Sequence, residues 1–398
     1  FGVRIVRILA VIDVLSFQPA GGAGTVLIEV GRELVRRGHE VRVACRRRTD
    51  LPEEGEVLGL RVRTYAADTS RPWRVWTLGK RTTISAYDRG GRPDAVWTHH
   101  ALPTLWHSRR FARDPVPCVY TFHSPWHEEH LTRLGRPPGA LDRLSASLRR
   151  RFEARAIGRS AVVTVLSRAM GIKLAEVHGR RDAVEVIPGG ADLERFRPSA
   201  DREAARSGLG ADSETFLIAA VRSLIPRVGI DRLIEAFTAV RKQVPRARRL
   251  SGGQGPLRDS LEAQATALGL GDSVRFLGFV ADPYLPALLS AADVVAMPSQ
   301  ELEGFGLVAA EAIACGTPVV STPVGGLPEV IAPLDPSWVA DGTDSDAIAA
   351  ALLRVARATA PRAEVQARCR AHAEARFGWG RFAEGLDRAI AAGREKTL

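Results

Sequence analysis

The chain has 398 residues, enough for two or three domains that each bury a core of their own. Apolar residues make up an ordinary 45% of it and no stretch reaches the length of a membrane span, which argues against a membrane-spanning protein. The net charge of +11 has two explanations. One is the arginine usage of a GC-rich genome; the other is a function that needs attraction to an acidic membrane face or to a polyanionic ligand.

The four cysteines are scattered along the chain without paired spacing, at Cys45, Cys118, Cys315 and Cys369. This pattern indicates neither a disulfide framework nor a zinc site. No secretory signal is visible, although the chain does not begin with Met. We therefore expect a reducing, cytoplasmic setting.

The first half begins as a Rossmann-like βαβ unit. Arg4 to Val14 has the apolar character of a buried strand, Pro19 to Gly24 is a glycine-rich turn, and Thr25 to Arg37 repeats apolar residues at helical spacing. Gly38 ends that helix and a second strand follows. The Gly-Gly-Ala-Gly of the turn lacks the Gly-x-Gly-x-x-Gly spacing of the dinucleotide fingerprint, so this pattern does not predict a dinucleotide site.

Two further buried strands are predicted at 94–98 and 116–121, and the second leads into a polar loop that contains His123. Open α/β sheets bind ligands at the carboxyl ends of their strands, although a single histidine there is more often structural. His127 and His130 suggest a zinc protease, but they lie three positions apart beside a proline, whereas that motif needs histidines four apart on one helical face. We expect a loop here.

The remaining elements alternate in the same way. We expect an arginine-rich amphipathic helix at 141–157, a strand at 161–166 followed by the helix cap Ser167, and a strand at 184–187. The polar segment 199–213 is typical of a linker. Beyond it, strands are predicted at 216–221, 274–277 and 293–297, a helix at 230–240, helical segments after 346, and a last helix at 381–391.

The most informative stretch is Pro298 to Val320. Gly304 and Gly306 form a loop whose backbone can approach a ligand, and Leu307 to Ala314 are good helix formers ended by Gly316 and a proline. The start of such a helix presents unpaired N–H groups that bind anions. Glu303 and Glu311 flank this position, and two carboxylates beside a phosphate need hydroxyl donors. A nucleotide sugar supplies phosphates and hydroxyls together.

Glu303, Gly-Phe-Gly, and Glu311 after seven intervening residues, followed by Ala-Cys-Gly-Thr-Pro-Val-Val, resemble the donor site of retaining glycosyltransferases of family 4. The resemblance extends over nearly the whole chain and implies the α/β GT-B fold, two facing Rossmann-like domains with an interdomain cleft. It places an acceptor-side domain at residues 1–198, on which a C-terminal helix at about 380–398 packs back. Residues 199–379 form the donor-binding domain.

The resemblance also implies roles for single residues. His123 reaches the transferred sugar, Arg222 and Arg227 neutralise the donor diphosphate, and Glu303 holds sugar hydroxyls. The implied donor-binding residues are Gly21, Gly22, Gly253, Gly255, Phe279, Gly304, Phe305, Gly306, Leu307 and Glu311. Apart from the resemblance, Trp126 and Glu129 are candidates to stack on and hydrogen-bond a polar acceptor, with an ordinary structural role as the alternative. The family's diphosphate lysine is replaced by Val228, which either transfers its task to Arg227 or marks a subgroup with altered donor handling.

The implied activity is transfer of a hexose from a UDP- or GDP-sugar to an acceptor hydroxyl with retention of configuration. We expect no cofactor besides this co-substrate, no metal because no Asp-x-Asp motif is present, and no nucleic-acid partner. The acceptor could be a lipid, a cell-envelope intermediate or a secondary metabolite, with peripheral contact to the inner membrane face. The alternatives are a nucleotide-sugar epimerase or hydrolase of the same fold, or a non-catalytic nucleotide-sugar binder.

Overall fold

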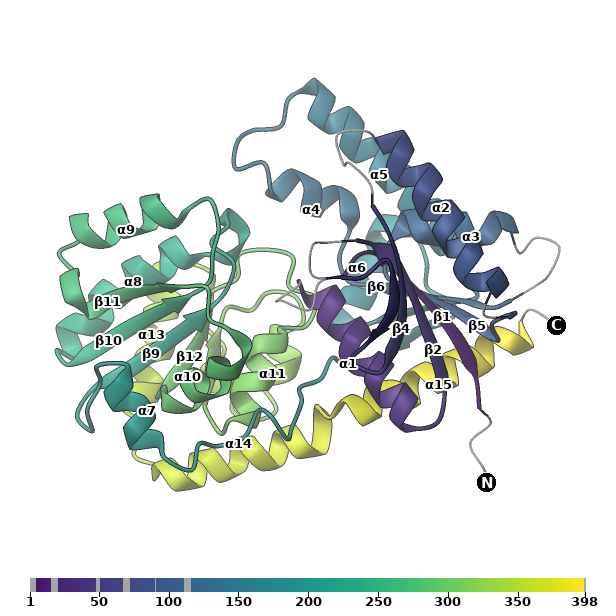
Figure 1. The fold of residues 1–398 in the computed structure, drawn as a ribbon. Coiled ribbons are helices and arrows are strands. Elements are labelled where there is room, and N and C mark those ends of the chain that lie inside the picture. The colour runs from purple at the N-terminus through teal and green to yellow at the C-terminus, as the bar shows by residue number, and fades with distance from the viewer. Residues whose placement is uncertain are drawn as a thin grey trace. The chain divides into compact units, whose positions relative to one another are not determined.

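The computed structural model describes residues 5–15, 21–47, 51–66, 72–89, 91–110 and 116–396 (Figure 1). By its internal contacts the chain divides into two compact units. Unit 1 takes residues 1–131, 138–188 and 379–398, and unit 2 takes residues 132–137 and 189–378. The main division therefore falls at Pro188–Gly189, whereas the sequence places it after residue 198.

Unit 1 is built on an eight-stranded sheet in the order β3-β4-β2-β1-β5-β6-β7-β8, in which only the β3–β4 pair is antiparallel among the described strands. The strands are β1 Arg7–Val14, β2 Glu40–Arg46, β3 Glu54–Val57, β4 Leu60–Tyr65, β5 Ala95–Thr98, β6 Cys118–Phe122, β7 Val162–Val165 and β8 Val184–Val186. The central strands are buried along their whole length, as expected of a parallel sheet covered on both faces.

Seven helices of the described chain accompany this sheet: α1 Gly22–Arg36, α2 Pro72–Arg89, α3 Ala101–Arg110, α4 Trp126–Thr132, α5 Ala140–Gly158, α6 Arg168–His178 and α15 Trp379–Glu395. The last of them comes from the C-terminus and packs beside α1, β6 and β7 (Figure 1). The Arg37 guanidinium ties the start of α15 to the end of α1, donating to the carbonyl of Gly380 at 2.9 Å and to Glu384 at 3.1 Å.

Unit 2 is built on a five-stranded parallel sheet in the order β11-β10-β9-β12-β13. Its strands are β9 Phe216–Val221, β10 Ala247–Gly252, β11 Val274–Gly278, β12 Val294–Met297 and β13 Val319–Ser321. Its helices are α7 Arg202–Gly208, α8 Ile230–Gln243, α9 Arg258–Ala267, α10 Leu285–Ala291, α11 Leu307–Ala314, α12 Leu327–Ile331, α13 Ser345–Ala356 and α14 Arg362–Arg376, with short 3-10 turns η1 Pro226–Val228, η2 Gly271–Ser273, η3 Asp282–Tyr284 and η4 Pro336–Trp338. Fully buried side chains of α8 and α13, such as Phe237 and Leu352, pack with β9 into one core.

The predicted loop after β6 is wrong, because Trp126–Thr132 forms helix α4. The proline that suggested a loop directly precedes the helix, a position where proline costs nothing, and Glu128 and Glu129 favour its first turn. The predicted turn at 19–24 is also wrong at its end, since Gly21 is the N-cap of α1 and Gly22 begins that helix; residues 19 and 20 lie outside the described residues.

The predicted linker at 199–213 contains a short helix, α7. Asp201 caps it by accepting from the backbone N of Ala204 at 2.8 Å, and the Arg206 guanidinium binds the Asp293 carboxylate at 3.0 Å. The local cap and the contact to the distant Asp293 stabilise a helix that the polar composition alone does not predict. Within the described helices, none is long and apolar enough to cross a bilayer.

Candidate active site

In unit 2 the loops at the carboxyl ends of the strands are joined by backbone hydrogen bonds. The N–H of Arg222, after β9, donates to the carbonyl of Gly252 in β10 at 2.9 Å. Gln300, after β12, donates to the carbonyl of Arg227 at 2.8 Å. Gly326, after β13, donates to the carbonyl of Glu303 at 2.9 Å. The sheet thus presents one connected set of loops at the edge where open α/β sheets bind ligands.

Arg222 and Glu303 form the charged centre of these loops. The Arg222 guanidinium donates to the Glu303 carboxylate and, at 3.1 Å, to the hydroxyl of Ser299, which in turn donates to the same carboxylate at 2.9 Å. Burial raises the pKa of Glu303, but Arg222 and Ser299 outweigh it and hold that pKa below its usual range. Glu303 is therefore an ionised carboxylate whose position is fixed by two donors.

Arg227 and Val228 point in different directions. The Arg227 guanidinium donates to the carbonyl of Leu302 at 3.2 Å, and its charge contributes to the lowered pKa of Glu303. Val228 is only 2% exposed and belongs to the core beside α8. The 3-10 turn η1 therefore brings an arginine to the site and buries the position that carries lysine in the family.

Two glycines let the loop after β10 approach the loop after β9. A Cβ on Gly253, whose φ is +131°, would lie 1.9 Å from the carbonyl oxygen of Arg222. A Cβ on Gly255 would lie 2.2 Å from the carbonyl oxygen of Leu224. These contacts allow no side chain, so both glycines shape the backbone around Arg222. Phe279 follows β11 next to them and is exposed.

Helix α11 begins directly after the glycine loop. Gly306 is its N-cap at a φ of +92°, and the predicted bounds Leu307–Ala314 are confirmed. The Phe305 side chain is buried and meets the ring of Phe377 edge-on, with centroids 5.8 Å apart. A Cβ on Gly189 would lie 2.6 Å from the Phe305 ring, so the glycine at this position makes room for Phe305. Only the backbone of Phe305 is left for a ligand.

The other predicted donor residues lie along the same loop and helix. Gly304 and Leu307 are half-buried beside the N-cap, and Glu311 is half-buried one turn into α11. Burial raises the pKa of the Cys315 thiol to about 12, and the charge of Glu311 adds to that shift. Glu311 is thus close to Cys315, on the same short helix whose start faces the loop.

In unit 1 the predicted His123 follows β6 and pairs with a second histidine. Its Nε2 lies 2.9 Å from Nδ1 of buried His99, which follows β5, with one ring donating to the other. Burial and, to a lesser extent, His100 lower the pKa of His123 to about 3. His123 is therefore a neutral imidazole near pH 7, and its paired nitrogen is engaged by His99.

The acceptor-side residues Trp126 and Glu129 lie on α4. The backbone N–H of Trp126 donates to the buried carboxylate of Glu153 at 3.0 Å, and the Arg149 guanidinium lies 5.3 Å from the Trp126 ring centroid. At the start of α1, a Cβ on Gly21 would meet no atom within 4 Å, so packing does not require glycine there.

In unit 2 the structure thus brings together Arg222, Arg227 and Glu303, with Gly253 and Gly255 against the loop that carries Arg222. Separately, it places the predicted residues of unit 1 at or after strand ends of its own sheet. Ser299 and His99 belong to these sites but were not predicted from the sequence. His99 directly follows buried strand β5 and Ser299 lies two residues after buried strand β12, and this position is the signal that could have found them. Among the described residues, no group of three or more His, Cys, Asp or Glu could hold a metal ion.

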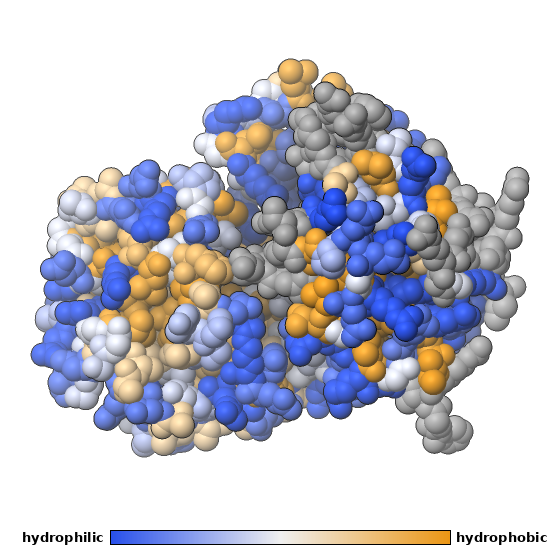
Figure 2. All heavy atoms as spheres, in the orientation of Figure 1, coloured by the Kyte–Doolittle hydropathy of each residue, from blue (hydrophilic) through white to orange (hydrophobic). Residues whose placement is uncertain are grey.

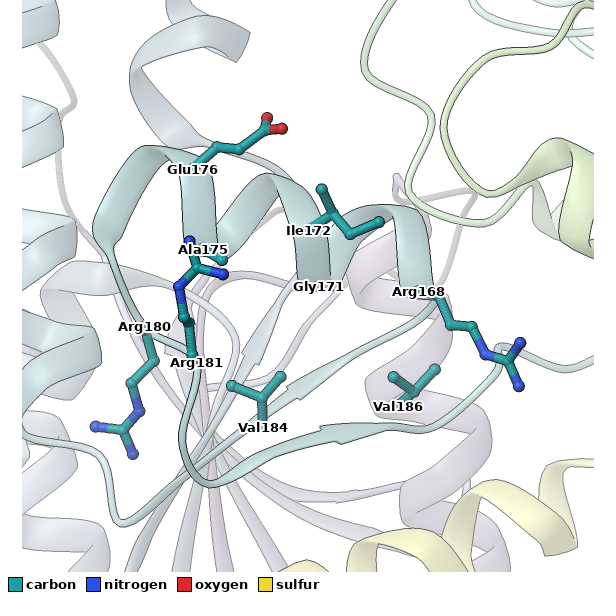
Figure 3. Close-up of a pocket in the computed structure, with 9 residues that line it drawn as sticks. All are labelled: Arg168, Gly171, Ile172, Ala175, Glu176, Arg180, Arg181, Val184 and Val186. Atoms are coloured by element: carbon teal, nitrogen blue, oxygen red, sulfur yellow. The ribbon is translucent and has the colours of Figure 1, made fainter.

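A hollow of about 470 Å³ lies outside this site, between α6 and the edge strand β8 (Figure 3). Its apolar lining comes from Ile172 and Ala175 on the helix and Val184 and Val186 on the strand, with Arg168 and Arg181 nearby. None of the residues that line it is a predicted site residue.

Two family models match the chain: Glycosyltransferase Family 4 over residues 20–195 and Glycosyl transferases group 1 over residues 201–376. The chain is 33% identical to the D-inositol 3-phosphate glycosyltransferase of Salinispora arenicola, over 92% of this chain and 86% of that protein. It is 38% identical to the GDP-mannose-dependent alpha-(1-6)-phosphatidylinositol monomannoside mannosyltransferase of Mycolicibacterium smegmatis, a match that spans 51% of this chain and 55% of that protein.

Solved structures share the fold. Sucrose-phosphate synthase from Thermosynechococcus elongatus superposes with a TM-score of 0.78 at 24% identity, covering 96% of this chain and 98% of that chain. Anabaena HepE in complex with UDP and glucose gives a TM-score of 0.76 at 22% identity, covering 97% and 99%. At these identities the likeness concerns the fold alone.

Proposed function

The chain belongs to glycosyltransferase family 4, whose members are retaining enzymes of the GT-B type, and from this premise we propose that it transfers a hexose from a GDP- or UDP-sugar to a hydroxyl of an inositol-bearing acceptor. The proposal that this chain binds a nucleotide-sugar donor rests on the Arg222–Glu303 pair beside the start of α11. The proposed class of acceptor is supported by the relatives, which are named for inositol 3-phosphate and for phosphatidylinositol monomannoside.

In this proposal the donor diphosphate is bound by Arg222, Arg227 and the N–H groups at the start of α11. These groups favour the negative charge that grows on the diphosphate as its bond to the anomeric carbon breaks. The acceptor oxygen forms the new bond on the same face of the sugar, and its proton passes to the leaving phosphate oxygen. The products are the glycoside and a nucleoside diphosphate.

The carboxylates have separate tasks. Glu303 is ionised and fixed, so it accepts hydrogen bonds from sugar hydroxyls without moving. Glu311 accepts from the ribose diol. His123, neutral because of its lowered pKa, contacts the transferred sugar without adding charge.

Arg227 takes the role that lysine has elsewhere in the family. Its guanidinium is close enough to Glu303 to lower the pKa of that group, and a planar fork of donors matches phosphate oxygens well. Two arginines and a helix terminus supply positive charge at the donor, so we propose turnover without a divalent ion. We place the enzyme in the cytoplasm, in peripheral contact with the inner face of the membrane.

The experiment is a measurement of nucleoside diphosphate release from GDP-mannose, GDP-glucose, UDP-glucose and UDP-galactose with EDTA present. Each donor is offered alone, with an inositol phosphate, and with a phosphatidylinositol mannoside, and Arg222→Ala serves as the inactive control. We expect release that requires one acceptor class and a product with the anomeric configuration of the donor. Release without any acceptor would favour the epimerase or hydrolase, and binding without release would favour the non-catalytic binder.

A further inference from the structure

Helix α5 carries a stripe of exposed apolar side chains. Leu141, Leu144, Leu148 and Phe152 are 82%, 58%, 46% and 37% exposed. Their spacing of three, four and four residues places them on one side of the helix. Figure 2 shows apolar surface at the end of the molecule where α5 begins. We refer to these four residues as the α5 stripe.

The opposite side of α5 is fixed to the rest of unit 1. The buried carboxylate of Glu153 accepts from the Tyr120 hydroxyl at 3.3 Å and from the backbone N–H of Trp126 at 3.0 Å, and lies 2.9 Å from Nε2 of His178. The helix also packs along α3, as Figure 1 shows. The helix cannot rotate to cover its stripe without breaking these buried contacts, so the stripe is a fixed feature of the surface.

The exposed part of α5 is also strongly basic. Arg151 and Arg155 are exposed on the side of the stripe, with Arg155 one turn beyond Phe152, whereas Arg143 and Arg150 are exposed on the other side of the helix. Neither carboxylate of the helix lies on the side of the stripe. Asp142 accepts from the backbone N–H of Gly139 at 2.9 Å at the start of the helix, and Glu153 is buried.

We propose that this face of α5 docks on a membrane surface rich in anionic lipid. Leu and Phe side chains on one side with arginines beside them are the pattern of a helix that lies in the headgroup region, where apolar groups reach the acyl boundary and cations meet phosphates. A second copy of the chain fits this face poorly, because two arginine-rich helices would repel each other. An acidic protein surface would leave the four apolar side chains without an apolar environment.

The inference deepens the membrane contact proposed above and rests on that part of the proposed function. Vesicle binding needs neither donor nor acceptor, so its failure would leave the transfer activity standing. Conversely, an inactive enzyme that still bound vesicles through α5 would contradict the transfer activity alone.

The test is flotation with phosphatidylcholine vesicles that contain or lack phosphatidylglycerol, at low and high salt. We expect wild-type protein to bind only the anionic vesicles, less strongly as salt rises. Leu148→Asp removes one apolar anchor and should weaken binding about tenfold or more. Arg155→Glu replaces an attractive charge by a repulsive one and should weaken it at least about fivefold.

Matched controls carry the same changes elsewhere. Ile172→Asp alters an exposed apolar residue on α6, and Lys242→Glu reverses an exposed charge on α8. Both should bind like wild type, and circular dichroism melting should show that all four variants are folded. Equal binding by Leu148→Asp and Ile172→Asp would overturn the proposal, as would wild-type protein that ignores anionic vesicles. A dimer that Leu148→Asp abolishes, without vesicle binding, would assign the stripe to a second copy instead.

Discussion

The Arg222 guanidinium donates to the Glu303 carboxylate across 81 positions of the chain, from the loop after β9 to the loop after β12. The two side chains are 10% and 12% exposed, and Ser299 bonds to both. The group that we propose for the phosphates and the group that we propose for the sugar hydroxyls are thus held together in the protein without a donor. Catalysis by charge stabilisation depends on such groups being in place beforehand.

Replacing Glu303 by Gln keeps the shape of the side chain and removes its charge. We expect turnover to fall by about two to three powers of ten, because the fixed acceptor for sugar hydroxyls is weakened. We also expect the free energy of unfolding to fall by about 3 kcal/mol, since Arg222 is left without its buried counter-charge. Initial rates and urea unfolding measure the two effects. Glu301→Gln, an exposed acid two residues earlier, is the control, and equal behaviour of the two variants would refute the role of Glu303.

Arg227 and Val228 should respond in opposite ways to substitution. Arg227→Ala should lower turnover by about two powers of ten with little change in stability, because one donor to the diphosphate is lost. Arg227→Lys keeps the charge and should retain more activity than the alanine variant. Val228→Lys places a charge in the core and should cost about 4 kcal/mol or more of unfolding free energy. A stable Val228→Lys enzyme with improved donor binding would contradict the assignment of Arg227.

Gly253→Ala tests the close approach of two loops, with Gly269→Ala as its control. Gly269 also has a positive φ, +69°, but a Cβ there would meet nothing within 4 Å. The control should cost only the backbone strain of about 1 kcal/mol and leave activity unchanged. Gly253→Ala would push its Cβ against the carbonyl oxygen of Arg222, so we expect a larger loss of stability together with a loss of activity. Equal effects in thermal melting and kinetics would show that the contact is unimportant.

Unit 1 should lose stability in mild acid. The pKa of His123 is lowered to about 3 and that of His99 lies well below its ordinary 6.5. As the pH falls below 6.5, the unfolded chain therefore binds protons at these two rings that the folded chain does not bind. The stability from these neutral rings is complete above pH 6.5 and is lost as pH falls below it, by about 1.4 kcal/mol per pH unit for each extra proton bound. Urea unfolding followed from neutral to acidic pH measures the slope. His123→Gln should reduce it, and an unchanged slope would mean that His123 titrates normally.

Much of the fold could be predicted because its signals are local. Helix α11 has its predicted bounds, since the glycines that mark its ends, Gly306 and Gly316, lie within two residues of it in sequence. The cap at Ser167 is confirmed in the same way, by its hydrogen bond from the backbone N of Met170. Features set by residues far along the chain were missed, such as α7, which Asp293 holds through Arg206, and α4, whose first N–H group is bound by Glu153.

The candidate site shows the same limit. The family resemblance assigned Arg222 and Glu303 to one donor, but the direct pair and its link through Ser299 depend on how the ends of β9 and β12 meet. At Val228 the sequence left open whether Arg227 takes over the phosphate contact or donor handling is altered; in the structure η1 turns Val228 into the core and Arg227 toward Glu303. No periodicity in the sequence reports the direction of a side chain within a single short turn.

The donor site in the unit 2 loops is tested most directly by calorimetric titration of GDP- and UDP-sugars into wild-type protein and Arg222→Ala, with EDTA present. We expect wild-type protein to bind one nucleotide sugar per chain and the variant to bind it at least about tenfold more weakly, because a charge-assisted contact to the diphosphate is lost. Equal affinity of the two proteins for the same donor would place the nucleotide sugar elsewhere and contradict the assignment of the unit 2 loops.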